Sequence, residues 1–277
     1  MNPLSPEAVL ASVRDLPPLP AVVMELIQSL GNEVVGAEYL AQEIARDPAL
    51  SAKVLRLANS SLYGMSRQVT SISDATAILG LRSLRSVATA AGLAGSFASV
   101  HCAGFDFKAF WRHTIGTALC ARALAQALRT NEETAFTLGL LHDIGQLALA
   151  STFPEATAGA LQYQRAHDCH GLEAERATLG TDHCAVGGLI AEHWHFAPAI
   201  VAAIAGHHEP PMTGAADVVH VADNMAHALD LSLLEQELVP PLSMSAWMRL
   251  GLNEAQCRKI FQQVETEHEA VCAALFM

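Results

Sequence analysis

The sequence is poor in aromatic and charged residues, and it contains no long uninterrupted apolar run. Aromatic residues make up 5% and charged residues 16% of the 277 positions, whereas hydrophobic residues make up 51%. This composition excludes a chain that is disordered throughout, because enough apolar surface is available to form a core. The longest weakly apolar run, Ser86 to Val100, is interrupted by polar residues and is shorter than the roughly 20 residues of a spanning helix. We therefore expect one large domain or two modest ones, with no membrane segment.

Basic residues are also few, and this limits the partners that the protein can have. The chain has 16 Lys and Arg against 28 Asp and Glu, which gives a formal net charge of −12. Such an acidic excess repels nucleic-acid phosphates and anionic membranes, so we expect neither as a partner. The first residues show no signal-peptide pattern, and the six cysteines form no CxxC pair. These features are typical of a cytoplasmic protein with reduced thiols.

Helical periodicity runs through nearly the whole chain, and few segments alternate as a strand would. We expect an all-α multi-helix bundle, with an N-terminal helical subdomain at residues 1–104 packed on a second helical subdomain at residues 105–277. Gly104, in a stretch with little helical pattern, marks the boundary. The helices expected in the first part are 4–14, 20–31, 37–46, 48–58, 75–79 after a Ser73-Asp74 cap, and 80–100 after a turn at Gly80. Those expected in the second part are 107–128, one capped by Asn131 that runs to His142, 147–165, 182–194 capped by Thr181, 198–206, 215–231, 245–250 and 254–275.

The 13 histidines fall mainly at predicted helix ends and on inward faces. His142 and Asp143 lie where a helix is expected to end at Gly145, which can adopt the positive φ of a helix terminus. Adjacent side chains on a straight helix diverge by about 100°, so both can bind one metal ion only where the backbone turns. The sequence Leu141 to Gly145 therefore predicts a pair of ligands at a turn.

Other candidate ligands occur on four further helices. His113 lies near an apolar stripe, and His183 shares its face with Val186 and Ile190. His207 and His208 end a helix just before two prolines. Asp223 stands in an apolar helix, where a buried carboxylate is costly unless it is paired or binds a metal. Imidazole and carboxylate ligands from several helices are typical of bundle sites for Fe, Mn or Zn.

Each pattern also has a purely structural explanation. A single His-Asp dipeptide arises by chance, and an inward histidine is often a hydrogen-bonded core residue. Asp223 could also pair with His227 one turn later. The order of the candidates along the chain favours the metal site.

That order, with the HDIG motif at His142 to Gly145, resembles the HD superfamily of phosphohydrolases. The first hundred residues resemble the HDOD (HD-related output domain) family of that superfamily more closely. The phrases that carry this resemblance are LPPLP at 16–20, IARDPAL at 44–50, VLRLANS at 54–60 and SISDA at 71–75. The resemblance covers roughly residues 10 to 230 and implies an all-helical bacterial signal-transduction output module.

The resemblance also implies a site with a divalent metal, mononuclear or dinuclear, with Fe or Mn favoured and Zn possible. His113, His142, Asp143 and Asp223 would hold a first ion, and His183, His207 and His208 would complete a second site bridged by Asp143. If the site is active, Asp143 would be its catalytic residue, and Gln146 and Arg112 would face the substrate.

Three departures from the family pattern bear on activity. Gln146 replaces the lysine that usually follows HDIG, Ala109 stands where some relatives supply a Glu ligand, and no GYP segment follows His208. A glutamine cannot neutralise phosphate charge, so hydrolysis of cyclic-di-GMP is disfavoured.

Two hypotheses for the function remain. The protein is a regulatory module for an unidentified signalling protein or a small phosphate ligand, or it is a metal-dependent phosphohydrolase with a phosphodiester or nucleotide substrate. The sequence leaves the oligomeric state open.

Overall fold

The computed structural model describes residues 3–14, 16, 19–28, 36–60, 68–97, 101–212, 214–235 and 238–276. Within these ranges every regular element is an α-helix and no strand occurs, which confirms the all-α prediction. The helices are α1 (Pro6–Arg14), α2 (Ala21–Gln28), α3 (Ala37–Arg46), α4 (Pro48–Ala58), α5 (Ile72–Ser96), α6 (Phe107–Leu128), α7 (Glu132–Leu141), α8 (Ile144–Thr152), α9 (Pro154–His167), α10 (Gly171–Leu179), α11 (His183–His193), α12 (Pro198–Ala205), α13 (Gly214–Ala228), α14 (Met244–Leu250) and α15 (Glu254–Phe276).

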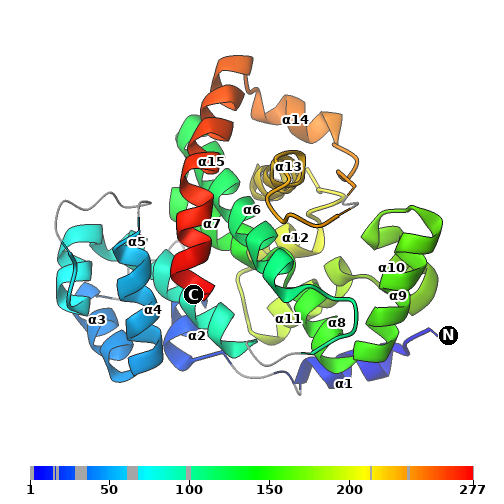
Figure 1. Cartoon of the computed structure of the whole chain (residues 1–277), viewed down its shortest axis with the longest axis horizontal. Coiled ribbons are helices and arrows are strands. Elements are labelled where there is room, and N and C mark those ends of the chain that lie inside the picture. The colour runs from blue at the N-terminus through cyan, green and yellow to red at the C-terminus, as the bar shows by residue number, and fades with distance from the viewer. Residues whose placement is uncertain are drawn as a thin grey trace.

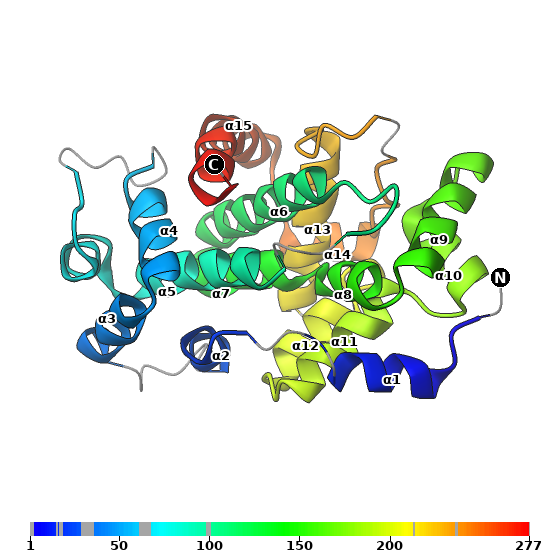
Figure 2. The same ribbon diagram turned by 60° about the horizontal axis from the view of Figure 1, so that its bottom comes forward.

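Helix α6 lies at the centre of the bundle and packs against α7, α13 and α15 (Figure 1). Its residues from Ala109 to Ala121 are all buried, because α7, α13 and α15 pack around it. Helices α3, α4 and α5 form one end of the molecule, and α9 and α10 form the other (Figure 2). This arrangement leaves the N-terminal half of α6 facing the space between α9–α10 and α13.

The N-terminal helices contact both predicted subdomains. Helix α1 packs on α11, and the backbone N–H of Leu4 donates to the carbonyl of Leu179 over 2.8 Å. The side-chain amide of Gln28 donates to the carbonyl of Trp194 over 2.9 Å. The division at residues 104 and 105 stays a prediction, and these contacts tie α1 and α2 to the second part.

Several helix limits differ from those expected. Ser71, whose hydroxyl accepts from the N–H of Asp74, caps α5 earlier than the predicted Ser73-Asp74 cap. The break at Gly80 is confirmed, since its φ of 74° interrupts the helix. The predicted helix 147–165 is wrong, because Pro154 cannot continue α8 and begins α9 instead.

Two further differences concern the region before the His183 helix. Helix α10 was not predicted, and Asp182 rather than Thr181 caps α11 by accepting from the N–H of Ala185. The predicted helix end at Gly31, the prolines Pro17 and Pro18, and the predicted end near Val100 lie outside the described residues. None of the described helices has the length and apolar character needed to cross a membrane.

Candidate metal centre

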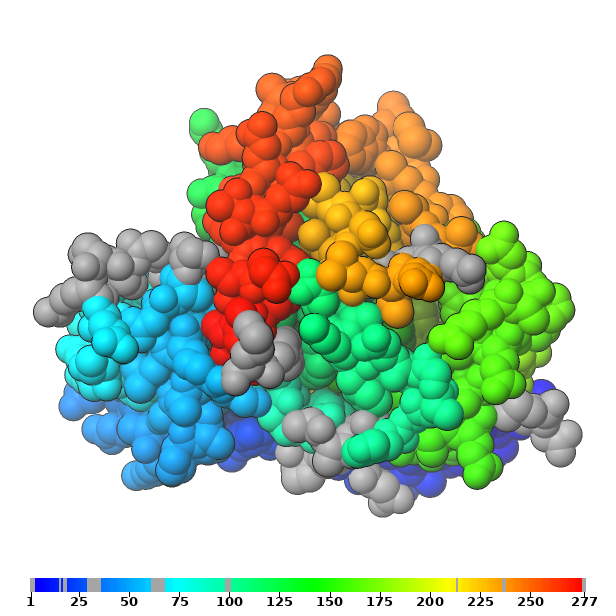
Figure 3. Space-filling model, viewed as in Figure 1, coloured from blue at the N-terminus to red at the C-terminus, as the bar shows by residue number. Residues whose placement is uncertain are grey.

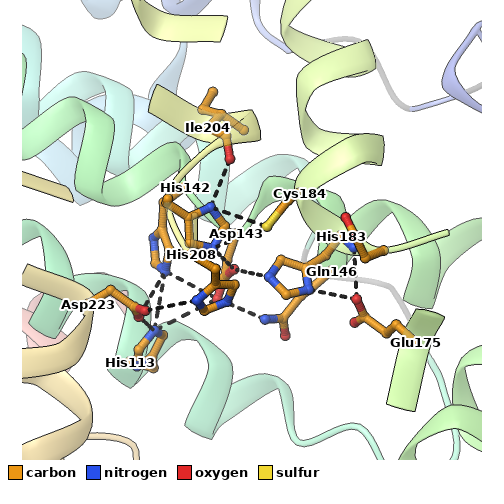
Figure 4. A network of polar contacts seen from close by, with 12 residues as sticks. His113, His142, Asp143, Gln146, Glu175, His183, Cys184, Ile204, His208 and Asp223 are labelled. Carbon is orange, nitrogen blue, oxygen red and sulfur yellow. Dashed lines mark hydrogen bonds and ion pairs between the residues drawn. The ribbon is translucent and has the colours of Figure 1, made fainter. Parts of the chain in front are cut away.

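All seven predicted ligands converge at one place, although they come from five parts of the chain. Figure 4 shows this group around Asp143. The carboxylate of Asp143 is the centre of the group, and Asp223 lies beside it. The contributing elements are α6 (His113), the α7–α8 turn (His142 and Asp143), the start of α11 (His183), the turn after α12 (His207 and His208) and α13 (Asp223).

The turn between α7 and α8 brings two adjacent side chains to the same point. Helix α7 ends at Leu141, Asp143 has φ −99° and ψ 17°, and α8 begins directly afterwards. The change in direction leaves Nε2 of His142 only 3.2 Å from Oδ2 of Asp143. The two side chains therefore meet at a turn as expected, and their role as metal ligands stays a prediction.

The predicted role of Gly145 is wrong. Its φ is not positive, and it lies inside α8, the helix that follows the turn. A Cβ atom at this position would stand 1.9 Å from the carbonyl oxygen of His183 and 2.8 Å from the nitrogen of Gly187. Glycine is required because α8 crosses α11 with the two backbones in contact, which also brings His183 next to Asp143.

Hydrogen bonds fix the orientation of three imidazoles. The Nδ1 atom of His142 lies 2.7 Å from the carbonyl oxygen of Gly139, and that of His207 lies 2.8 Å from the carbonyl oxygen of Ile204. The Nδ1 atom of His183 lies 2.7 Å from Oε2 of Glu175. Because each partner is an acceptor, each Nδ1 carries a proton, and in a neutral ring Nε2 then presents a lone pair.

These three Nε2 atoms all face the carboxylate of Asp143. They lie 3.2 Å (His142), 3.4 Å (His183) and 3.4 Å (His207) from its oxygens. An acceptor facing an acceptor in a buried site is unfavourable, so a positive charge is required between them. Either protons on the imidazoles or a metal ion can supply it.

In the absence of a metal, protons fill this role. Burial lowers the pKa of His142, but the Asp143 and Asp223 carboxylates outweigh burial and raise it to about 9. Burial likewise opposes the charged forms of His183 and His207, yet nearby anionic groups raise both pKa values well above the usual range. A divalent cation would displace these protons, so metal binding and protonation compete at the same nitrogens.

Burial and spacing show that the donor set fits a metal ion. Among the described residues, Asp143 Oδ1, His183 Nε2 and Asp223 Oδ2 are buried without a hydrogen-bond partner. Ligands about 2.1 Å from one cation stand roughly 3.0 to 3.5 Å apart. The Nε2 atom of His113 lies 3.0 Å from Asp223 Oδ1 and 3.3 Å from His142 Nε2. These separations match those of a shared coordination shell.

Asp143 lies between two groups of ligands. Its Oδ2 atom faces His142 and His113, the latter at 3.8 Å, and its Oδ1 atom faces His183 and His207. His208 joins the second group, because one of its ring nitrogens lies within 4.8 Å of donor atoms of His183 and His207, and its Nδ1 atom also lies 3.6 Å from Oδ2 of Asp223. Burial, reinforced by the charge of His207, lowers the pKa of His208 to about 2, which keeps its ring neutral. The predicted bridging position of Asp143 agrees with this geometry, and the ligand set itself stays a prediction.

Two residues near the ligands were missed by the sequence analysis. The Nε2 atom of His227 lies 3.3 Å from Oδ1 of Asp223, and the sulfur of Cys184 lies 3.7 Å from Nδ1 of His207. Burial raises the pKa of Cys184, but the charges of His183 and His207 lower it to about 7. The i, i+4 spacing from Asp223 was the signal for His227, which was predicted as a possible partner of that carboxylate and was not included among the ligands.

A cavity of about 820 Å³ opens in front of the ligands. Its inner wall includes His113, Asp143, His183, His208 and Asp223. The outer walls come from α9–α10, the start of α6 and residues 234–235 and 238–241, and the molecular surface is hollowed between these segments (Figure 3). The site is therefore accessible to a small ligand.

The two predicted substrate-binding residues have different positions. Gln146 lines the cavity and donates to Oδ2 of Asp143 over 2.9 Å. Arg112 does not line it, because its buried guanidinium donates to the carbonyl of Leu231 and to Glu269. The structure thus places Arg112 outside the predicted substrate site, where it joins α6 to α15.

The cavity has an acidic rim. Two arginines, Arg165 and Arg176, lie among the residues that line it, and Arg176 pairs with Asp182 and Glu209 at 2.7 and 2.9 Å. The acidic residues on the rim are Asp106, Asp168, Glu173, Glu209 and Glu235. A highly charged phosphate ligand would therefore depend on bound cations at the inner wall.

Glu175 orients His183, and its removal should weaken metal binding. The carboxylate accepts from both the backbone N–H and the ring Nδ1 of His183, at 2.8 and 2.7 Å. We expect Glu175→Ala to lower metal affinity about 10- to 100-fold, the usual effect of losing such a partner. Glu175→Gln keeps an acceptor oxygen and should lose much less. Isothermal titration of metal-stripped protein would measure both, and equal affinity in the alanine variant would contradict this role.

Comparison with known proteins agrees with this geometry. A model of the HDOD domain matches residues 16–210, within the region where the resemblance was predicted. An uncharacterized protein of Treponema pallidum (strain Nichols) is 27% identical over 203 residues, which cover 72% of this chain and 39% of that protein. The chain thus corresponds to about two fifths of the length of this curated relative.

Solved structures share the fold along nearly the whole chain. An HDOD domain protein of unknown function from Geobacter sulfurreducens has a TM-score of 0.82 at 23% identity, with 98% of both chains covered. A protein from Shewanella amazonensis SB2B, provisionally described as a phosphohydrolase, has a TM-score of 0.76 at 28% identity, with 97% of this chain and 98% of that one covered.

Proposed function

Because this chain belongs to the HDOD family, we propose that it is a bacterial signal-output module whose helical bundle holds divalent metal ions. One observation carries the proposal. The Nε2 atoms of His142, His183 and His207 converge on the buried carboxylate of Asp143 at 3.2 to 3.4 Å, an arrangement that needs positive charge between them, which a divalent metal ion would supply.

Each group of ligands would hold one ion. His113, His142, Asp143 and Asp223 would form the first position, and His183, His207, His208 and Asp143 the second. Mixed imidazole and carboxylate donors suit Fe or Mn, with Zn as a further candidate. When bound, such ions lower the pKa of a coordinated water and stabilise negative charge on a phosphoryl oxygen.

An apolar surface beside the cavity supports a role in partner binding. Six of the exposed large hydrophobic side chains lie between residues 233 and 248, on the segment that also forms part of the cavity rim. Exposed large apolar side chains that gather on one face are typical of interaction sites, and these six follow one another closely along the chain. The six residues are Leu233, Leu234, Val239, Leu242, Met244 and Met248. A signalling protein that binds here would contact a segment that also lines the cavity.

Elemental analysis tests the proposal directly. The protein should be purified without a metal-binding tag, and we expect about two equivalents of a divalent first-row metal per chain. Protein without metal, even after incubation with Fe, Mn or Zn under reducing conditions, would contradict the metal centre.

A second candidate function is hydrolysis of a phosphodiester or nucleotide. The cavity favours it, because a substrate placed there would contact the ligand-bearing wall directly. Gln146 weighs against it, since an amide beside Asp143 cannot neutralise the charge of a phosphoryl group. Cyclic-di-GMP hydrolysis stays disfavoured for this reason.

Gln146→Lys tests whether a missing positive charge limits hydrolysis. We expect the lysine to raise turnover of the best substrate at least about tenfold, because one donor aimed at a developing oxyanion is often worth more. Phosphodiesters and nucleotides would be screened with Fe or Mn present. Gln164→Lys, at another position that lines the same cavity, is the matched control for an added charge. Unchanged turnover in the Gln146 variant would contradict this explanation of weak catalysis.

A further inference from the structure

His227 lies near the end of α13, one turn after Asp223, and its ring packs against that of His113. The two ring centroids are 4.3 Å apart. The side chain of His227 is 14% exposed, whereas that of Asp223 is 1% exposed, and both line the cavity. His227 therefore stands between the buried carboxylate and the open part of the cavity.

Three imidazoles approach the same carboxylate oxygen. Oδ1 of Asp223 lies 3.0 Å from Nε2 of His113, 3.6 Å from that of His142 and 3.3 Å from that of His227. The His142 contact, at 3.6 Å, is longer than a hydrogen bond. Hydrogen bonding to Asp223 therefore does not account for all three contacts, whereas neighbouring ligands of one cation have such separations.

From this geometry we propose that His227 is a further ligand of the metal ion held by His113 and Asp223. The inference rests on the proposed metal centre and adds to it a residue outside the predicted ligand set. The donor atoms of His113, Asp223 and His227 all lie within 4.8 Å of one another. Opposite ligands of one ion are about 4.2 to 4.4 Å apart, so small shifts bring all three to a common ion.

Ala109 shows why this position needs a ligand from α13. It precedes His113 by one turn of α6, lines the same cavity and offers no donor atom. Residues four apart share a helix face, so Ala109 and His113 lie on the same face of α6, and of these two only His113 has a donor atom. His227 supplies a further donor from α13, the helix that packs against α6.

Titration with Mn²⁺ tests the assignment without reference to catalysis. Metal-stripped wild-type protein, His227→Ala and His227→Gln would be compared by electron paramagnetic resonance, which measures free Mn²⁺. We expect both variants to bind one equivalent at least about tenfold more weakly and the other equivalent normally. Nitrogen modulation of the bound ion in pulsed spectra should also decrease.

The glutamine variant separates ligation from simple pairing. Gln can still donate a hydrogen bond to Asp223 but is a poor metal ligand, so wild-type affinity in His227→Gln would overturn the inference and leave the metal centre intact. Wild-type protein that binds no Mn²⁺ would overturn the proposed function, and this inference with it. Melting curves would establish that each variant folds.

A compensating change provides a second test. Ala109→Glu in the His227→Ala background places a carboxylate one turn from His113, and we expect it to restore most of the lost affinity. His193→Ala removes an exposed histidine at the end of α11 and should bind Mn²⁺ as the wild type does. Absence of recovery in the double variant would count against a cation at this position.

Discussion

Replacing Asp143 with alanine is expected to abolish stable metal binding, with the loss of about two equivalents per chain. Oδ2 of this carboxylate faces His113 and His142, and Oδ1 faces His183 and His207. Removing it deletes a ligand from both positions and leaves the imidazoles without their anionic partner. Loss of an outer partner alone costs about 10- to 100-fold in affinity, so loss of a shared ligand should exceed about 100-fold.

Elemental analysis of the wild type and Asp143→Ala, purified side by side, would measure this effect. Glu173→Ala is the matched control, because it removes an exposed acidic side chain from the rim of the same cavity. Asp143→Asn keeps the shape but not the charge, and we expect it to lose most of the metal as well. Retention of two equivalents by Asp143→Ala would exclude a bridging role for this residue.

Gly145→Ala is expected to destabilise the protein by about 3 kcal/mol or more, at the upper end of overpacking effects. The added methyl would stand 1.9 Å from the carbonyl oxygen of His183 and 2.8 Å from the nitrogen of Gly187. Both are backbone atoms, so no side-chain rotation relieves the clash, and α8 must move away from α11. For a chain of this size, such a loss lowers the melting temperature by about 6 to 12 °C.

Gly95→Ala is the control for this experiment. Gly95 also lies inside a helix, and a Cβ there would meet only the end of the Lys53 side chain, at 3.5 Å. Alanine is the better helix former, so this variant should melt at or slightly above the wild-type temperature. Thermal unfolding followed by circular dichroism would measure both. Wild-type stability in Gly145→Ala would contradict the backbone contact between α8 and α11.

Separation of α8 from α11 should also weaken metal binding. Asp143 immediately precedes α8, and His183 is the first residue of α11, so the two ligands move apart when the helices do. Glycine at 145 therefore connects fold stability to the geometry of the site.

The sequence by itself determined the helical class, most helix positions and the identity of the seven candidate ligands. These features depend on local information. Apolar spacing marks buried helix faces. Asn131 caps α7, because its side chain accepts from the N–H of Thr134, and Gly80 interrupts α5 through its own backbone conformation. The HDOD motifs could be recognised in the sequence because each is a continuous stretch of residues.

Only the tertiary structure decided how these residues meet. It assigned Gly145 to a helix crossing rather than a positive-φ turn, turned Arg112 toward Glu269 and brought His227 to Asp223 and His113. It also fixed the protons of His142, His183 and His207 on Nδ1 through Gly139, Glu175 and Ile204. Distances between groups on different helices depend on packing over the whole bundle, so they cannot be predicted from a local sequence pattern.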